Sequence, residues 1–380
     1  MAEYEFLLRD PLTLEYVDEL HPDDLAAAKW TRRDIGGGKW SATIPRVTQR
    51  RNYGPSVLAA HRILEVRRDG EQEFVGVLES RQIDPLGRIW TIGGPDLAGF
   101  WLPMRTVGAT TPEARSGAAE TVAKAYVEAH IGPSAAVARR PPGPATWTVE
   151  ADGGAGGSVT ISAQRRSLLQ VAQEAMLAGD RTHEVVLLPD YSGYQYQVRR
   201  PVDGTVGGSG AAPFSVDWNN VEELVYLEDF REYRNMLYVA GDGTGAARNV
   251  TEVEGADVAT HFRREGTLDA RYATSAALRT AAGELDLAMR SQLLVRVSAT
   301  PFRGSANAVY REDWDVGWNI TFGESELREE PIDIRVVAAT VELTRAVGER
   351  ITFELGEYQP TSTLRRLGDA LRRLQVAANE

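Results

Sequence analysis

The glycine-rich stretch over residues 203–213 contains the serine whose spacing comes nearest to a catalytic motif. Residues 207–211 read G-G-S-G-A, which differs from the G-x-S-x-G elbow of serine hydrolases only at its last position. That elbow needs a hydrophobic strand before the serine and a helix after it, so that the hydroxyl is strained and exposed. A polar run precedes Ser209 and an Ala-Pro-Phe run follows it, so a flexible loop is the stronger interpretation.

A second glycine-rich turn, G-D-G-T-G over residues 241–245, is similar to a phosphate-binding loop. A dinucleotide fingerprint needs glycine spacing that opens a helix. The A-A-R-N-V run that follows has the pattern of an extended segment. We therefore expect a hairpin loop here, and no cofactor.

The histidines and acidic residues do not form a ligand set that can be recognised by spacing. None of the five histidines stands at H-x-H or H-x-x-x-H spacing, so no metal site is predicted from His21, His61, His130, His183 and His261. Acidic residues cluster at 222–223, 228–229, 313–315 and 324–330. A glycosidase needs two facing carboxylates, and these clusters leave that alternative open. A solvated acidic surface is the stronger interpretation.

Eight tryptophans are spread over the whole chain. They could form a platform on which sugars stack. Because they do not recur at a fixed period, packing in the core and at subunit interfaces is the stronger interpretation.

Composition excludes several classes of protein. The 380 residues predict two or three domains. The absence of cysteine excludes disulfides and cysteine-based zinc sites, and the net charge of −12 argues against a nucleic-acid binder. No apolar run approaches the roughly 20 residues of a membrane helix, and the M-A-E-Y start lacks the pattern of a secretory signal.

The clearest strand signal is a hairpin. Residues 62–66 and 73–80 are strand-like, and Asp69-Gly70 between them is a strong turn signal. A third strand over 88–93 is expected antiparallel to the second. Alternating segments predict further strands at 184–188, 194–199, 292–299, 316–322, 331–345 and 349–357.

Two helices carry capping signals. The first is predicted over about 112–129, with Thr110 and Glu113 as a capping box and an apolar stripe along one face. Ser167 and Gln170 form a second capping box, which opens a short helix.

Two more helical segments follow, an Ala- and Leu-rich one over about 267–290 and a final amphipathic one over about 361–378. The final helix has a narrow leucine stripe, and an isolated helix of this length is marginal in water. It must therefore dock on its own chain or on a neighbour. The whole pattern is α+β with strands dominant.

Residues 217–248 carry a family resemblance. They read DWNNVEELVYLEDFREYRNMLYVAGDGTGAAR, in which an acidic and aromatic run leads into an Asn–x–x–Tyr–x–x–Gly–x–Gly passage that ends in arginine. Together with the segments 88–107, 111–140 and 333–357, in the same order, this passage resembles the hub proteins at the tail tip of siphophages of Gram-positive bacteria.

The resemblance implies a β-dominant α+β fold with two tail-tube-like β-barrel domains and an inserted mixed α/β region, similar to the hub proteins of contractile phages. The implied division is a first barrel over 1–108, the mixed region over 109–200, a second barrel over 201–358 with a helical insertion near 267–290, and the C-terminal helix over 359–380.

The resemblance also implies a structural protein of the virion without catalysis, cofactor or metal. It would be a homotrimeric baseplate hub at the tail tip, assembled in the host cytoplasm, that adapts a hexameric tail tube to a threefold tip and closes or opens the DNA channel. The implied partners are other copies of the chain, the distal tail protein ring, the C-terminus of the tape measure protein, and tail fibre or receptor-binding proteins. DNA would pass through without specific binding.

Ten residues are candidates for assembly contacts: Tyr226, Phe230, Tyr233, Asn235, Tyr238, Arg248, Leu364, Leu367, Leu371 and Leu374. A basic channel wall would bind phosphates and stall the genome. We therefore expect the wall to carry more Asp, Glu, Ser and Thr than Arg.

Two other functions stay open. One is a cell-wall polysaccharide-active or carbohydrate-binding tail protein, which would use the carboxylates and tryptophans. The other is the equivalent hub of a phage-derived contractile injection particle. Larger hub proteins carry long C-terminal extensions with hydrolase or host-binding parts, and we expect no such hydrolase here.

Overall fold

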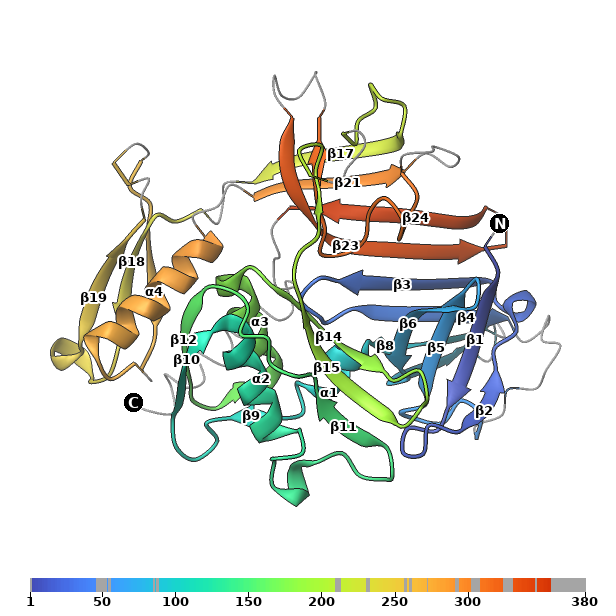
Figure 1. The fold of residues 1–380 in the computed structure, drawn as a ribbon, viewed down its shortest axis with the longest axis horizontal. Helices are drawn as coiled ribbons and strands as arrows, with labels where there is room; N and C mark the ends of the chain where they lie inside the picture. Colours follow the sequence, from blue (N-terminus) through green and yellow to red (C-terminus); the bar gives the residue numbers. More distant parts are fainter. Residues whose placement is uncertain are drawn as a thin grey trace.

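The computed structural model of the chain contains three regions (Figure 1): a large β region, an α/β unit below it, and a small inserted unit to one side. The structure describes residues 2–45, 53, 56–84, 86, 89–208, 213–229, 233–255, 258–259, 262–271, 273–290, 294–301, 308–323, 331–345 and 347–356.

A ten-stranded sheet dominates the β region, and its main path runs β17-β21-β24-β23-β3-β4-β8-β7. Every neighbouring pair on this path is antiparallel. Its strands are β3 (Ala27–Arg33), β4 (Lys39–Pro45), β7 (Ser80–Asp84), β8 (Ile89–Pro95), β17 (Val221–Asp229), β21 (Leu294–Pro301), β23 (Ile332–Thr344) and β24 (Gly348–Leu355). Two further strands branch from the path, since β22 (Asn319–Phe322) pairs with β23 and with β16 (Asp203–Gly204).

The two halves of the path have the same strand order. The path strands of the C-terminal half are, in chain order, β17, β21, β23 and β24. Side by side in the sheet they lie in the order first, second, fourth and third, which is β17, β21, β24 and β23. The N-terminal half repeats this order with β3, β4, β8 and β7. The halves join where β23 pairs with β3, from Ala338 opposite Arg33 to Thr344 opposite Ala27. Among the described residues, the path is a duplicated four-stranded unit that ends in β17 and β7.

A smaller sheet covers the apolar face of the N-terminal half. Its order is β2-β1-β5-β6, with β1 (Tyr4–Arg9), β2 (Tyr16–Glu19), β5 (Ile63–Arg68) and β6 (Glu71–Val77). In β4, Trp40, Ala42 and Ile44 are buried, because side chains alternate between the two faces of a strand. The core between the sheets continues under the C-terminal half as far as Phe353 and Leu355.

The α/β unit has its own core, built around α2 (Ala119–His130) and α3 (Leu168–Gly179). The strand pair β10 (Glu113–Ala118) and β12 (Ser158–Ala163) packs with these helices, as does the sheet β11-β15-β14. The remaining elements of this unit are α1 (Leu97–Trp101), β9 (Thr106–Val107), the 3-10 turn Val137–Arg139, β11 (Thr146–Val149), β13 (Arg166–Ser167), β14 (Thr182–Leu187) and β15 (Gly193–Arg199).

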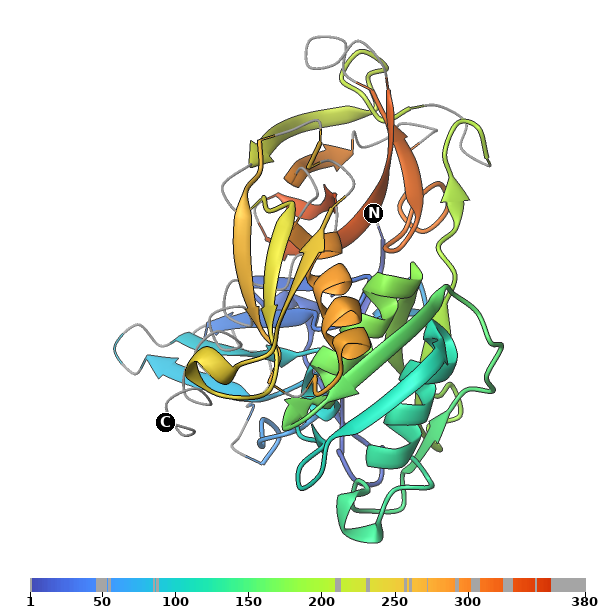
Figure 2. The same cartoon turned by 90° about the vertical axis from the view of Figure 1, so that its left-hand side faces the viewer.

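The small unit is inserted between β17 and β21, and Figure 2 shows it in front of the other two regions. Three strands in the order β19-β18-β20 pack against α4 (Ala276–Arg290). The strands are β18 (Met236–Ala240), β19 (Val250–Glu254) and β20 (Glu265–Asp269). Its core of Leu237, Val239, Val253, Leu268 and Leu287 is separate from the other two.

The β-dominant α+β class predicted from the sequence is confirmed. The closed barrels expected with it are wrong for the described part of one chain, because the main sheet is an open path whose end strands do not pair with each other. The division into four segments stays a prediction.

The two helices with predicted capping boxes form, but neither capping box does. Residues 113–118 form β10, and α2 begins only at Ala119 with no side-chain cap. The segment pairs with β12 along its whole length, which outweighs its local helical pattern. Glu113 therefore does not cap a helix, and accepts hydrogen bonds from the amide of Gly108 and from His130. α3 begins where predicted, but the hydroxyl of Ser167 makes no capping hydrogen bond.

The predicted helix over 267–290 starts later than expected, because residues 265–269 form β20 beside β18. The predicted hairpin at Asp69-Gly70 is confirmed by β5 and β6. The third strand, β8, is antiparallel to the second predicted strand only at its end, where Ser80 pairs with Gly93 and Gly76 with Asp96; its main partners are β7 and β4. The predicted C-terminal helix lies outside the described residues.

Candidate functional site, the polar face of the central sheet

One face of the ten-stranded sheet packs into the core, and the opposite face is polar. Residues directly opposite each other on paired strands share a face, so the pairing identifies this polar face. Its described hydroxyl residues include Thr31, Ser41, Thr43, Thr91, Ser298, Thr300, Thr340 and Thr352. Its described charged residues include Lys29, Arg33, Lys39, Arg350, Asp84, Glu223, Glu342 and Glu354.

Four threonines form a row across the middle of the polar face. Thr31 pairs with Thr340, which pairs with Thr352, and the hydroxyl of Thr352 lies 3.4 Å from that of Thr300. The hydroxyls of Thr31 and Thr340 are 2.9 Å apart. Threonine suits both the strand and the cross-strand hydrogen bond. The row belongs to both halves of the duplicated sheet and crosses the junction between them.

Charges of opposite sign neutralise each other beside this row. Lys29 Nζ lies 3.6 Å from Glu342 Oε2, across the junction of β3 and β23. Arg350 on β24 pairs with Glu223 on β17, across the intervening strand β21. Exposed pairs of this kind contribute little to stability. The paired charges leave this face close to neutral, and among its described residues hydroxyls outnumber arginines, although Thr31 and Thr300 are buried.

Below the polar face, a buried cluster fastens the smaller sheet to the C-terminal half. Glu73 on β6 accepts hydrogen bonds from Trp30 Nε1 at 3.3 Å and from the Tyr310 hydroxyl at 2.9 Å. Arg311 Nε lies 2.8 Å from the other oxygen of Glu73. Breaking one partner of such a buried pair is strongly destabilising, because the other charge stays buried.

The passage with the family resemblance divides between two regions: its first part forms β17 of the main sheet, and residues 233–248 fold into the small inserted unit. Asn235 is fully buried and its side chain joins the start of β18 to the segment before β20, since its amide oxygen accepts from Arg264 N at 2.7 Å and its amide nitrogen donates to Phe262 O at 3.2 Å. Arg248 donates to the carbonyls of Ala240 and Gly241 at 3.0 Å and pairs with Asp269. The arginine therefore holds the glycine-rich hairpin loop in place.

The other candidates for assembly contacts do not form one cluster among the described residues. Tyr233 is buried, and the Tyr238 hydroxyl lies 3.3 Å from Glu265. Tyr226 lies on β17, at the free edge of the main sheet. Phe230, Leu364, Leu367, Leu371 and Leu374 lie outside the described residues. The role of all ten residues in assembly stays a prediction.

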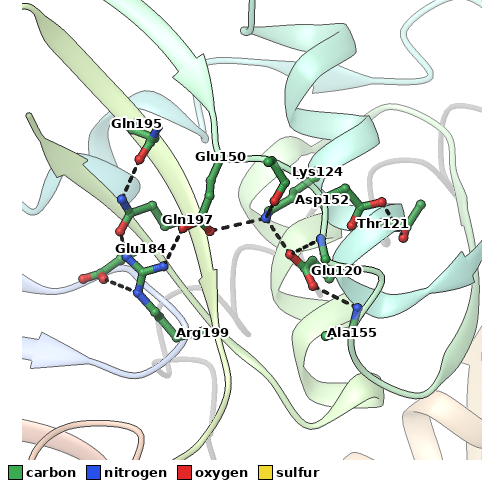
Figure 3. A network of polar contacts seen from close by, with 12 residues as sticks. Glu120, Thr121, Lys124, Glu150, Asp152, Ala155, Glu184, Gln195, Gln197 and Arg199 are labelled. Carbon is green, nitrogen blue, oxygen red and sulfur yellow. Dashed lines mark hydrogen bonds and ion pairs between the residues drawn. The ribbon is translucent and has the colours of Figure 1, made fainter.

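A carboxylate pair suited to glycoside hydrolysis was the main alternative, and the α/β unit contains two glutamates that share one lysine (Figure 3). Glu120 and Glu150 both contact Lys124 Nζ, at 2.5 and 3.3 Å. Burial opposes ionisation, but the Lys124 ammonium and the loop amides of Gly153 and Ala155 lower the pKa of Glu120. A general acid needs a raised pKa, so this network holds a loop and does not fit that role.

Buried acids with raised pKa values occur where the sheet meets the α/β unit. Burial raises the pKa of Asp34 to about 7 and that of Asp96 to about 6. Burial also lowers the pKa of His183, whose ring lies beside Gly36, to about 4. Asp96 accepts the amide of Gly38 at 2.6 Å and that of Gly99 at 2.5 Å, where it caps α1. These groups are enclosed in the packing and do not line an open cleft.

The two glycine-rich motifs singled out in the sequence do not form a described catalytic or phosphate-binding site. Ser209 lies outside the described residues, and residues 241–245 form the expected hairpin loop between β18 and β19. Within the described ranges no group of three or more histidines and acidic residues is arranged to hold a metal ion. None of the helices described there is long and apolar enough to cross a membrane.

The polar face was not predicted as a unit. Alternation in β23 and β24 was visible in the sequence, but the threonine row depends on strand pairs far apart in the chain. A run of Thr and Ser at every second position of several strands is the signal that indicates such a face.

Phage tail proteins are among the solved structures that share this fold. The chain aligns over 93% of its length with 96% of a tail protein from Neisseria meningitidis MC58, at 15% identity and a TM-score of 0.53. It aligns equally far with the 43 kDa tail protein of prophage MuSo2 from Shewanella oneidensis, at 10% identity and a TM-score of 0.57. Prophage tail protein gp18 from Listeria monocytogenes EGD-e matches over 98% of this chain and 99% of its own, at 10% identity and a TM-score of 0.53.

The fold is therefore that of phage tail proteins. No curated protein matches the sequence. Residues 8–357 match the family described as Siphovirus ReqiPepy6 Gp37-like protein, and the chain belongs to this family. The resemblance to siphophage tail proteins noted in the sequence is confirmed at this level.

Proposed function

We propose that this chain is a structural protein of the siphophage tail tip, where three copies form a hub ring around the DNA channel. The observation that carries the proposal is the duplicated four-stranded unit, which has one polar face and ends in the strands β17 and β7. Three copies would present six such units. Such a ring matches a hexameric tube above it while keeping threefold symmetry below, and closed rings built from head-to-tail contacts are common.

The polar face suits the wall of a channel through which DNA passes. A basic wall would bind phosphates through counterion release, and DNA would stick to it. The described part of the polar face has paired charges, a threonine row and few arginines. Such a wall wets the channel without attracting the duplex, which agrees with a net charge of −12.

The small inserted unit and the α/β unit would then lie outside the channel wall, where the other tail components bind. On this proposal the partners are the distal tail ring, the tape measure protein and the fibre or receptor-binding proteins. The ring would close or open the channel at infection.

Light scattering on the purified protein tests the assembly, and the expected mass is that of a trimer. A stable dimer or tetramer would contradict the ring. A structure of the assembled ring tests the wall, and we expect the polar face to line the channel. Release of reducing sugars from purified peptidoglycan would instead favour the cell-wall enzyme.

A further inference from the structure

We infer that β7 of one copy pairs antiparallel with β17 of the next copy, in one specific register. That register places Gln82 opposite Leu227 and Asp84 opposite Val225. The inference rests on the proposed ring, and it adds which strands meet and which residues face each other.

Both end strands are accessible for such pairing. All five residues of β7 are exposed, and they include Ile83 at 45% exposure. On β17, Val225 is 65% exposed. An exposed edge with apolar side chains is a template for another strand, and soluble proteins usually cover it. Among the described strands, none pairs with the outer side of either edge.

The chain itself contains a template for the contact. Within one copy, the third strand of the C-terminal unit, β23, pairs antiparallel with the first strand of the N-terminal unit, β3. The two edges left over are the third strand of the N-terminal unit, β7, and the first strand of the C-terminal unit, β17. Repeating the internal contact between copies therefore joins β7 to β17, and the same contact closes the ring.

Matching the two units fixes the register. The second strands of the two units, β4 and β21, are matched so that the buried residue Ala42 corresponds to the buried residue Ala299. Ala42 lies opposite Ile92 on β8, and Ala299 lies opposite Phe353 on β24, so these two buried residues of the fourth strands also correspond. The internal pair of Trp30 and Val341 then has its counterpart in Tyr226 and Ile83. The full set of expected pairs is Ser80–Asp229, Arg81–Glu228, Gln82–Leu227, Ile83–Tyr226 and Asp84–Val225.

Two independent features agree with this register. It sets Arg81 opposite Glu228, and opposite charges across an antiparallel pair are favourable. It also gives a reasonable barrel. Starting at Leu224, the directly opposite residues on the next strands are Ala299, Phe353, Ala339 and finally Arg32 on β3. The residue of β3 that corresponds to Leu224 in the duplicated unit is Ala28. The register therefore shifts by four residues, from Ala28 to Arg32, for each four-stranded unit. Four residues over four strands correspond to a strand tilt of roughly 35°, which is within the usual range for closed barrels.

The absence of cysteine in the chain allows a direct test by disulfide trapping. The double variant Asp84→Cys with Val225→Cys is oxidised and run on a non-reducing gel. Directly opposite residues lie within disulfide range, whereas residues shifted by two along the strand are about 7–8 Å apart. We therefore expect covalent dimers and trimers, formed at least about tenfold faster than in the controls Asp84→Cys with Leu227→Cys and Asp84→Cys with Glu223→Cys.

The outcomes separate the register from the ring. If a shifted control forms the disulfide faster, the register is wrong while the trimeric ring stands. If light scattering finds a trimer and no pair forms a disulfide, β7 and β17 do not meet. If every variant stays monomeric at high concentration, the proposed function itself fails.

A charge exchange gives a second measurement that does not depend on disulfide geometry. Arg81→Glu places two acids opposite each other, and we expect the trimer to dissociate at a higher protein concentration than the original. Combining it with Glu228→Arg should restore assembly. Thermal unfolding of each variant controls for misfolding, and failure of the double exchange to restore a folded variant would overturn the pairing of these residues.

Discussion

The buried carboxyl group of Asp34 should make a large contribution to how the stability of the chain depends on pH. Asp34 follows β3 and is 4% exposed, with no hydrogen-bond partner for Oδ1. Its Oδ2 lies 4.0 Å from Arg335 on β23. Burial raises its pKa to about 7, although Arg335 and the amide of Ile35 oppose the shift. The substitution Asp34→Asn keeps the shape and removes the titration.

The sign and size of the effect follow from linkage between protonation and folding. Below the ordinary pKa of 3.8 the group is protonated in both the folded and the unfolded chain, so its contribution to stability is fully present. As pH rises toward about 7, only the unfolded chain ionises freely, and stability is lost. The shift of about three units at about 1.4 kcal/mol each gives a loss of about 4 kcal/mol as an upper value.

Urea unfolding at a series of pH values measures this effect. Between pH 4 and 7 we expect Asp34→Asn to gain stability relative to the original chain, by up to about 4 kcal/mol. Asp84→Asn on the exposed strand β7 removes one carboxylate from the surface and controls for the change in net charge. Equal pH dependence in the original chain and Asp34→Asn would refute the argument, because it would mean that Asp34 ionises normally.

Three further predictions concern other parts of the chain. Burial of His183, which lowers its pKa to about 4, should destabilise the fold as pH falls from 6.5 to 4, and His183→Leu should reduce that loss in the same urea titration. Asn235→Ala should destabilise the small inserted unit by about 2 kcal/mol, since it leaves buried backbone groups unpaired; faster hydrogen exchange confined to β18–β20 would show this, and unchanged exchange would contradict it. Leu371→Asp should weaken folding or assembly if the C-terminal stripe docks, and unchanged melting temperature and oligomer size would exclude docking.

Local signals predicted much of the β structure. The Asp-Gly turn at residues 69–70 has positive φ at both positions and joins β5 to β6 as expected. The alternating segments 331–345 and 349–357 form β23 and β24 almost at the predicted boundaries. These elements were predictable because the alternation of apolar and polar side chains along a strand, and the residues of a tight turn, can both be read from neighbouring positions in the sequence.

Other elements depended on contacts that local sequence does not encode. Residues 113–118 have a helical pattern, but pairing with residues 158–163 makes them a strand. Glu113 was assigned to a cap and instead contacts His130, one helix away. The same limit applies to the second partner of β8: the strand pairs with its neighbour in the chain, β7, but also with β4, which lies much earlier in the sequence.

The duplication shows why the candidate site could not be found from sequence identity. At matched positions the two units have different side chains, such as Trp40 and Val297, because the core under each unit is filled differently. What the units share is the order of four strands and the direction in which polar side chains point, and both are properties of pairing. A surface that guides DNA without binding it needs hydroxyls and paired charges at many positions, so no single residue has to be fixed. For that reason the functional hypothesis depends on a sheet face and two strand edges, and substitutions at the edges test it more directly than substitutions at any motif.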